Sequence, residues 1–187
     1  MSSMSRIFLS IDIEDETLLS RIANIQSELD RQSAKIKLVE RENIHFTLRF
    51  LGDTPHTKIE MIREELSLVQ FRPFTIRIEG IGAFPSTSRP RVIWVGVTEN
   101  ADRLTKLKLE IDDLLGNLSY PRDKKFHAHA TIARVRAVRD RSQTMKNIES
   151  LVRAPVGTMS VECFRMTKST LTSSGPVYET LWEVPSS

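Results

Sequence analysis

The sequence has a single cysteine, Cys163, among its 187 residues. One cysteine excludes an internal disulfide and a cysteine-based zinc site, and it fits a protein of a reducing compartment. No apolar run reaches the roughly 20 residues that a membrane-spanning helix needs, and the N-terminal residues lack the apolar core of a signal peptide. We therefore expect a cytoplasmic protein with no membrane partner.

Glycine is also scarce, with seven residues. Residues 80–90 contain two of them among other turn-forming residues, which predicts a loop. A nucleotide-binding glycine loop lies between a strand and a helix, and that setting is missing here, so the stretch does not predict a nucleotide site. The chain also shows no evident cluster of carboxylates to hold a metal ion.

The overall composition is that of a soluble globular protein, with 40% hydrophobic and 27% charged residues. The net charge of +3 suits an anionic ligand, although many proteins of this charge bind no nucleic acid. Proline and glycine mark no long linker, so residues 1–187 are expected to form one domain.

Two short stretches carry the pattern His-x-Thr among apolar residues typical of a strand. The first contains His45 and Thr47, and the second contains His129 and Thr131. Because side chains alternate across a strand, each histidine shares a face with its threonine, roughly 7 Å away. An imidazole changes protonation near neutral pH and a hydroxyl can bind an anion, so each pair suits one half of a phosphate site.

The two motifs have similar surroundings. A strand near Arg6 and a long helical segment precede His45, and a strand near Arg91 and another helical segment precede His129. The offset between the halves is 85 residues for the arginines and 84 for the histidines. This almost constant offset predicts an internal pseudo-repeat.

The predicted fold is α+β, with two pseudo-repeated lobes at approximately residues 5–70 and 90–150. Each lobe is expected to be a mainly antiparallel sheet with helices on its outer face, and the two His-x-Thr strands are expected to face each other across a central cleft. Two imidazoles in such a cleft suit in-line displacement at phosphorus, because one can accept a proton from the attacking oxygen while the other protonates the leaving oxygen. The two hydroxyls can hold non-bridging phosphate oxygens.

These features resemble the two-histidine phosphoesterase superfamily, most closely its RNA 2′,3′-cyclic phosphodiesterase branch, also called 2′–5′ RNA ligase or LigT-like. The segments that carry the resemblance are spread over nearly the whole chain: residues 6–12, 42–53, 80–84, 89–94, 169–171 and 175–178. The family often has proline where Ala128 stands and leucine where Ile132 stands, and His127 is an additional histidine. Only His129 has a threonine two residues later, so we assign the second catalytic role to His129.

The resemblance implies hydrolysis of a 2′,3′-cyclic phosphate at an RNA 3′ end, tRNA-like fragments included, to a 2′-phosphomonoester. It implies that His45 is the proton donor, that His129 is the proton acceptor, and that no nucleotide cofactor is required. Because the two imidazoles can move both protons, we also expect that no metal ion is needed. Thr47 and Thr131 would bind the phosphate. The site is nearly symmetric, so the two histidine roles could be exchanged. The family also performs 2′–5′ RNA ligation as a reverse-type reaction, and we expect a monomer.

Two arginines are candidates for RNA contacts. Arg49 shares the face of the first motif if alternation continues, whereas strict alternation turns Arg134 away from the second motif. The arginines from Arg134 to Arg141 favour a solvated face over a track for a phosphate backbone.

Three alternatives stay open at this point. His45, His127 and His129 could form a three-histidine zinc site. The chain could instead be a non-catalytic module that binds RNA ends, or a phosphoesterase that acts on a small cyclic nucleotide. Activity in the presence of a chelator would exclude the zinc site, and turnover would exclude the binding module.

Overall fold

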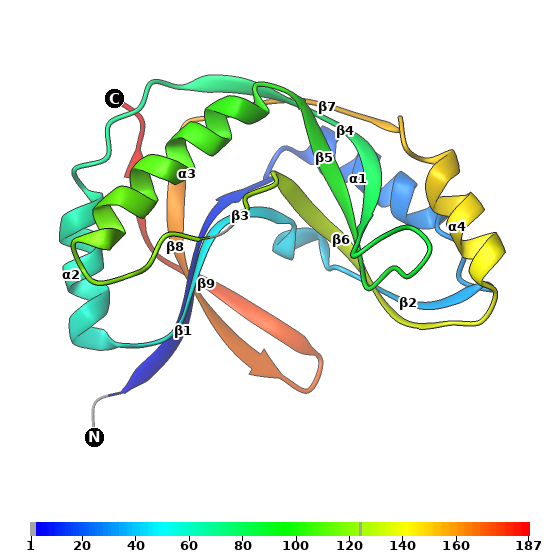
Figure 1. Ribbon diagram of the computed structural model, residues 1–187, viewed down its shortest axis with the longest axis horizontal. Coiled ribbons are helices and arrows are strands. Elements are labelled where there is room, and N and C mark those ends of the chain that lie inside the picture. Colours follow the sequence, from blue (N-terminus) through cyan, green and yellow to red (C-terminus); the bar gives the residue numbers. More distant parts are fainter. Residues whose placement is uncertain (1–2, 124) are drawn as a thin grey trace.

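The computed structural model describes residues 3–123 and 125–187, which form nine strands, four α-helices and a short 3-10 helix (Figure 1). The strands are β1 (Met4–Asp12), β2 (Ala34–Leu38), β3 (His45–Pro55), β4 (Phe74–Phe84), β5 (Val92–Glu99), β6 (His129–Val138), β7 (Pro155–Val161), β8 (Cys163–Thr172) and β9 (Gly175–Pro185). The helices are α1 (Glu16–Glu28), η1 (Arg41–Asn43), α2 (His56–Leu66), α3 (Ala101–Gly116) and α4 (Arg141–Ser150). None of the helices in these residues is both long and apolar enough to cross a membrane.

Helix α1 shows how local sequence sets an element. Asp15 caps its N-terminus, because the carboxylate accepts a hydrogen bond from the backbone N–H of Leu18 at 2.9 Å. Glu16 in the first turn complements the helix dipole. Leu18, Ile22 and Ile25 recur at helical spacing, and this face of the helix is buried.

The strands form one mainly antiparallel sheet in the order β7-β4-β5-β6-β3-β1-β8-β9, and β2 also pairs with β6. A single residue pair, Phe46 with Ala130, joins β3 to β6 and divides the sheet into two halves. The predicted α+β fold with two pseudo-repeated lobes is confirmed, and the lobes are the halves of one continuous sheet.

The register of the strands shows the repeat directly. Five residue pairs between β1 and β3 each have a counterpart between β5 and β6, 84 residues later in the chain. A β-bulge interrupts both ladders at the equivalent position. The first set is Phe8–Phe50, Leu9–Arg49, Ser10–Thr47, Ile11–Phe46 and Asp12–His45, and the second is Val92–Arg134, Ile93–Ala133, Trp94–Thr131, Val95–Ala130 and Gly96–His129. The offset of 85 expected for the opening strands is therefore one residue too long.

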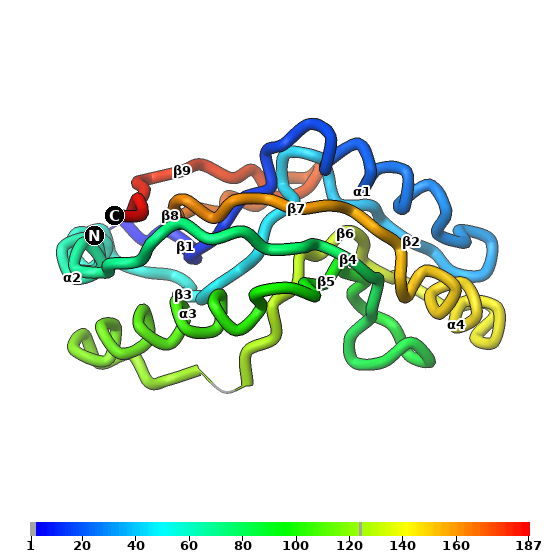
Figure 2. Tube along the Cα trace, turned by 90° about the horizontal axis from the view of Figure 1, so that it is seen from above, coloured from blue at the N-terminus to red at the C-terminus, as the bar shows by residue number. Residues whose placement is uncertain are grey.

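The first helix of each sequence half packs on the other half of the sheet. α1 follows β1 but contacts β6 and β7, whereas α3 follows β5 but packs on α2, which contacts β3. Figure 2 shows α1 and α3 on opposite sides of the sheet. Each lobe in space therefore contains a helix from the other half of the chain.

Two parts of the sheet differ from the expectation. β4 continues to Phe84, although the sequence predicts a loop from residue 80, because β5 pairs with it along this length. β7 was not expected, and it pairs with the other edge of β4. Pairing with neighbouring strands thus extends the sheet through a segment rich in turn-forming residues.

Candidate active site

The two His-x-Thr motifs lie side by side where the half-sheets meet. The residue pair between β3 and β6 sets an antiparallel register in which His45 lies opposite Thr131. In the same register, Thr47 lies opposite His129. Opposite side chains in a sheet are about 5 Å apart at Cβ and diagonal ones about 7–8 Å. The imidazoles therefore occupy one diagonal, with room for a phosphoryl group between them.

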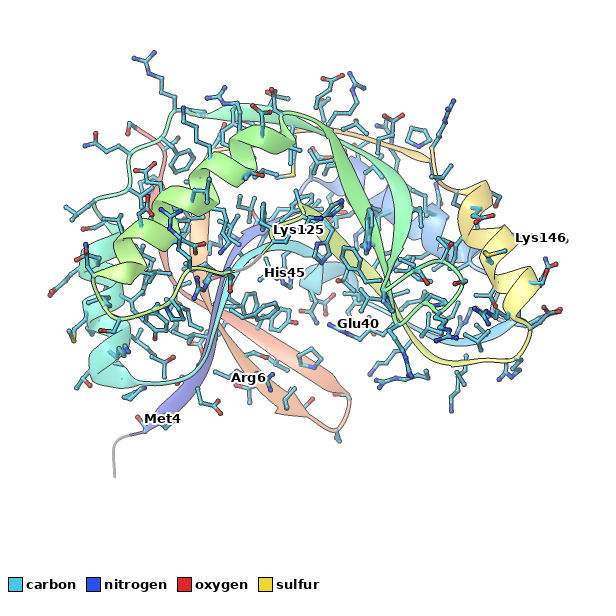
Figure 3. All side chains as sticks on the ribbon, viewed as in Figure 1. Met4, Arg6, Glu40, His45, Lys125 and Lys146 are labelled. Atoms are coloured by element: carbon cyan, nitrogen blue, oxygen red, sulfur yellow. The ribbon has the colours of Figure 1, made fainter. Side chains whose placement is uncertain are left out.

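All four motif side chains line a cavity of about 890 Å³. The β8–β9 hairpin and the segment before β6 contribute to its walls. Figure 3 shows His45 near the centre of the molecule, between Lys125 and Glu40, which also line the cavity. The hairpin is tied to the rim by the side-chain amide of Asn43, which donates to the Pro176 carbonyl at 3.2 Å.

Both histidines are held by the backbone carbonyl two residues earlier. His45 Nδ1 lies 2.7 Å from the carbonyl oxygen of Asn43, and His129 Nδ1 lies 2.7 Å from that of His127. A carbonyl oxygen can only accept a hydrogen bond, so each Nδ1 carries a proton and donates it. Nε2 is then the atom that takes up or delivers a proton. His45 Nε2 lies 2.9 Å from Thr47 Oγ1.

Aromatic rings restrict the orientation of both imidazoles. Phe8 stacks on His45 with ring centroids 4.9 Å apart, and Tyr178 meets the same imidazole edge-on at 5.4 Å. Phe84 meets His129 edge-on at 4.9 Å. These contacts bury part of each imidazole and leave little freedom for ring rotation.

Burial lowers the pKa of both imidazoles. For His45, desolvation is the largest cause, the backbone hydrogen bond and the charge of Asp12 oppose it, and the charge of Arg134 adds to it. For His129, desolvation again lowers the pKa most, its backbone hydrogen bond opposes this, and the neighbouring His127 lowers the pKa further. Both groups therefore titrate on the acid side of an ordinary histidine.

A β-bulge after the second motif decides which later side chain enters the cavity. Between Thr131 and Ala133, β6 has one extra residue, Ile132, relative to β5. An extra residue reverses the alternation, so Arg134 lies on the cavity face. The strict alternation that would turn Arg134 away from His129 is therefore interrupted, and Arg134 stays a candidate for an RNA contact.

The side chain of Gln26, from α1, holds this bulge in place. Its buried amide nitrogen donates to the carbonyl of Ile132 at 2.9 Å and to that of Val39 at 3.0 Å. The backbone N–H of Val39 also donates to the Ile132 carbonyl at 2.9 Å. A bulged residue is left out of the ladder, and these bonds satisfy its carbonyl and keep Arg134 on the cavity face.

The equivalent bulge at Leu48 has the opposite consequence for Arg49. It turns this side chain away from the motif, so that Arg49 is only 5% exposed. The guanidinium donates to Asp112 Oδ1 at 3.0 Å and to the Pro121 carbonyl at 2.6 Å. Although Arg49 borders the cavity, its charged group is engaged inside the protein, and this corrects the expectation of an RNA contact there. Phe50 takes the cavity position instead.

Asp112 is the centre of a buried ion network that supports this wall. Besides Arg49, it binds Lys108 Nζ at 2.7 Å through both carboxylate oxygens. Lys108 also donates to Asp123 Oδ2 at 2.9 Å. Through Pro121 and Asp123, the network fastens the segment before β6 to the strand that carries the first motif.

Comparison with known proteins identifies the family. The model of LigT like phosphoesterases matches the chain twice, over residues 11–94 and 95–178. The chain belongs to the LigT-like phosphoesterase family. An RNA 2′,3′-cyclic phosphodiesterase from Archaeoglobus fulgidus is 39% identical over 176 residues, which cover 94% of this chain and 97% of the relative. One from Aeropyrum pernix is 35% identical over 168 residues, which cover 89% and 96%.

Solved structures share the fold of this LigT-like protein. LigT from E. coli in complex with 3′-AMP superposes with a TM-score of 0.79 at 20% sequence identity, over 99% of each chain. TT0787 of Thermus thermophilus superposes with a TM-score of 0.78 at 26% identity, over 96% of this chain and 97% of the other. The shared fold therefore includes both lobes.

Two cavity residues of the LigT-like site were not predicted from the sequence. Phe50 and Tyr178 both line the cavity, and Phe50 is 71% exposed despite its size. The sequence repeat could have indicated Phe50. The residue 84 positions later is Arg134, which lies at the equivalent place after the second motif and also lines the cavity. No local pattern indicates that the ring of Tyr178 reaches His45, since that contact is tertiary.

The described residues contain no group of three His, Cys, Asp or Glu side chains placed to hold a metal ion. The imidazole of His127 packs among aromatic rings, 4.9 Å from Trp94 and 5.7 Å from Phe84 between ring centroids. The three-histidine zinc hypothesis therefore lacks geometric support in this part of the chain.

Proposed function

We propose that this LigT-like phosphoesterase hydrolyses the 2′,3′-cyclic phosphate at an RNA 3′ end to a 2′-phosphomonoester without a metal ion. The observation that carries the proposal is the diagonal pair His45 and His129, each with Nδ1 bound to a carbonyl and its ring on the cavity. The A. fulgidus and A. pernix relatives are named for this substrate, and their names support its choice.

The reaction uses one base and one acid on opposite sides of phosphorus. Neutral His129 accepts a proton from water at Nε2 while the water oxygen bonds to phosphorus. The bond between phosphorus and the 3′ oxygen breaks, and protonated His45 donates its Nε2 proton to that oxygen. The products are a 2′-phosphomonoester and a 3′ hydroxyl, and the two histidines have exchanged protonation states.

Asp12 supports the assignment of His45 as the proton donor. It pairs with His45 across β1 and β3, and Arg165 holds its carboxylate at 2.8 Å. Its charge raises the pKa of His45 against the larger effect of burial. Gly96 occupies the equivalent place beside His129, so only one imidazole has a carboxylate opposite it.

Thr47, Thr131 and Arg134 are proposed to bind the phosphate. Both hydroxyls stand on the cavity face with the two imidazoles. The charge of Arg134 lowers the pKa of His45, so the guanidinium is close enough to act on a phosphate bound beside that imidazole. Fixed donors of this kind stabilise the charge that develops on the non-bridging oxygens.

The same chemistry extends to ligation. If a 5′ hydroxyl replaces water, attack on the cyclic phosphate yields a 2′–5′ linkage and a 3′ hydroxyl. We place these activities in the cytoplasm, because a single free cysteine fits a reducing compartment. We also propose that the protein acts as a monomer, because one chain supplies both histidines of the cavity.

The direct test is incubation of an oligonucleotide ending in a 2′,3′-cyclic phosphate with the protein in excess EDTA, followed by product analysis. We expect a 2′-phosphate product at a rate that EDTA does not change. Turnover that EDTA abolishes and zinc restores would contradict the metal-free mechanism. RNA binding without turnover would favour the non-catalytic module.

We expect a bell-shaped pH dependence of kcat/KM with its maximum below about pH 6.5, the ordinary histidine pKa. Burial lowers the pKa of both His45 and His129. Activity therefore falls at lower pH when the base becomes protonated, and at higher pH when the acid loses its proton. A bound phosphate anion favours the imidazolium, so the kcat profile should lie at higher pH than the kcat/KM profile. Steady-state kinetics from about pH 4.5 to 8.5 measures both, and flat profiles would contradict two-histidine catalysis.

A further inference from the structure

A second cavity, of about 610 Å³, lies beyond the active site at the far end of β6. The loop between β4 and β5 and the start of α4 complete its lining, and Figure 1 shows these segments close together. Its lining has no acidic residue and five arginines: Arg89, Arg91, Arg136, Arg139 and Arg141. We call this cavity the basic groove. All five arginine side chains are exposed, so an external ligand can reach them.

The charges of the basic groove are not neutralised from within. In residues 3–123 and 125–187, none of the five arginines forms a salt bridge. Arg141 donates to the Ser88 carbonyl at 2.9 Å, and Arg139 also donates to backbone carbonyls. The nearby carboxylate of Asp140 caps α4 by accepting from the backbone N–H of Gln143 at 3.0 Å. A positive potential is therefore left for an external anion.

Arg136 connects the basic groove to the active site, because it lines both cavities. It follows Arg134 by two positions on β6 and is the extra residue of a β-bulge in the pairing with β2. Val135 between them is buried. The cations thus extend from the phosphate site into the basic groove, as binding of a polynucleotide backbone requires.

We propose that the basic groove binds the phosphodiester backbone of the single-stranded RNA on the 5′ side of the reacting end. A cyclic phosphate occupies the 3′ terminus, so the rest of the strand can only leave the active site in the 5′ direction. Arginine contacts to phosphate position a strand without reading its sequence. The inference rests on the proposed function, and it makes the substrate an oligonucleotide rather than a small cyclic nucleotide.

The test compares two double variants of equal charge change. Arg89→Gln with Arg91→Gln removes two cations of the groove, and within the described part of the chain only the backbone groups of these two residues are hydrogen-bonded. Arg72→Gln with Arg153→Gln is the control, because both arginines are exposed and lie outside both cavities. Each protein is assayed with an octanucleotide that ends in a 2′,3′-cyclic phosphate and with 2′,3′-cyclic AMP.

For the groove variant, we expect KM for the octanucleotide to rise roughly tenfold with kcat unchanged, while KM for 2′,3′-cyclic AMP stays constant. The slope of log KM against log salt should fall by about 0.7 for each phosphate that the variant no longer binds. The control should match the unsubstituted protein on both substrates. Equal KM values for the octanucleotide in all three proteins would overturn the inference, and so would equal increases for both substrates.

A binding measurement separates this inference from the proposed function. Fluorescence anisotropy with an octanucleotide that ends in a 3′-phosphate requires no turnover. Weaker binding by the groove variant alone would support the groove even if no substrate is hydrolysed. Hydrolysis of both substrates together with unchanged anisotropy would leave the proposed function intact and remove the groove.

Discussion

Replacing His45 or His129 by alanine is expected to lower kcat by about 10²–10⁴-fold, because each imidazole moves one proton in the same displacement. KM should change little, since the threonines and Arg134 would still bind the phosphate. The double variant should have about the same kcat as the slower of the two single variants, because the step needs both groups at once. Single-turnover hydrolysis of an oligonucleotide with a 2′,3′-cyclic phosphate end measures these effects.

His127 provides the matched control for this experiment. It lies beside His129 and lines the same cavity, but its imidazole packs against Trp94. His127→Ala should therefore lower kcat by less than about tenfold, which is well below the loss of a general acid or base. His56→Ala, at the start of α2, should have no effect. A large loss in His127→Ala together with a small loss in His129→Ala would transfer the role to His127.

Replacing Asp112 by alanine is expected to lower the free energy of unfolding by about 3–5 kcal/mol, because it removes the buried carboxylate that two buried cations share and leaves them only the half-exposed Asp123. Arg49 and Lys108 are 5% and 2% exposed, and both bind this carboxylate. Equilibrium unfolding in urea measures the loss as a lower midpoint. Activity should fall as well, because the network binds Pro121 and Asp123 of the segment before β6, and Asp123 lines the active-site cavity.

The next residue of α3 supplies the control. Asp113 forms a salt bridge with Arg122 on the surface, with side chains 57% and 64% exposed. Exposed pairs contribute less than about 1 kcal/mol, so Asp113→Ala should be close to neutral. Similar midpoints for the Asp112→Ala and Asp113→Ala proteins would show that the buried network contributes no more than a surface pair.

The catalytic motifs could be predicted because their signals are local. Alternation along a strand is enough to place His45 beside Thr47 and His129 beside Thr131, and the repeat indicates that the two pairs are related. The helical segment before His45, which forms α1, is predicted for the same reason. These features depend on residues within a few positions of one another.

Alternation along one strand does not place the arginines beside the motifs correctly, because β-bulges depend on two strands. The bulges at Leu48 and Ile132 exist only in the pairing with β1 and β5. One extra residue moves Arg49 to the interior and Arg134 to the cavity. The interior site for Arg49 also requires Asp112, which lies 63 positions away. No pattern in either strand alone contains this information.

By itself, the sequence determined the α+β class, the repeat, the histidine–threonine pairs and the family likeness, since each rests on short-range patterns or on their spacing. Only the tertiary structure decided that the two motif strands adjoin in one sheet, which side chains follow the histidines into the cavity, and where the basic groove lies. These features come from contacts between strands, helices and loops far apart in the chain. The stability of these contacts depends on burial and strand pairing, which arise only when separate segments come together.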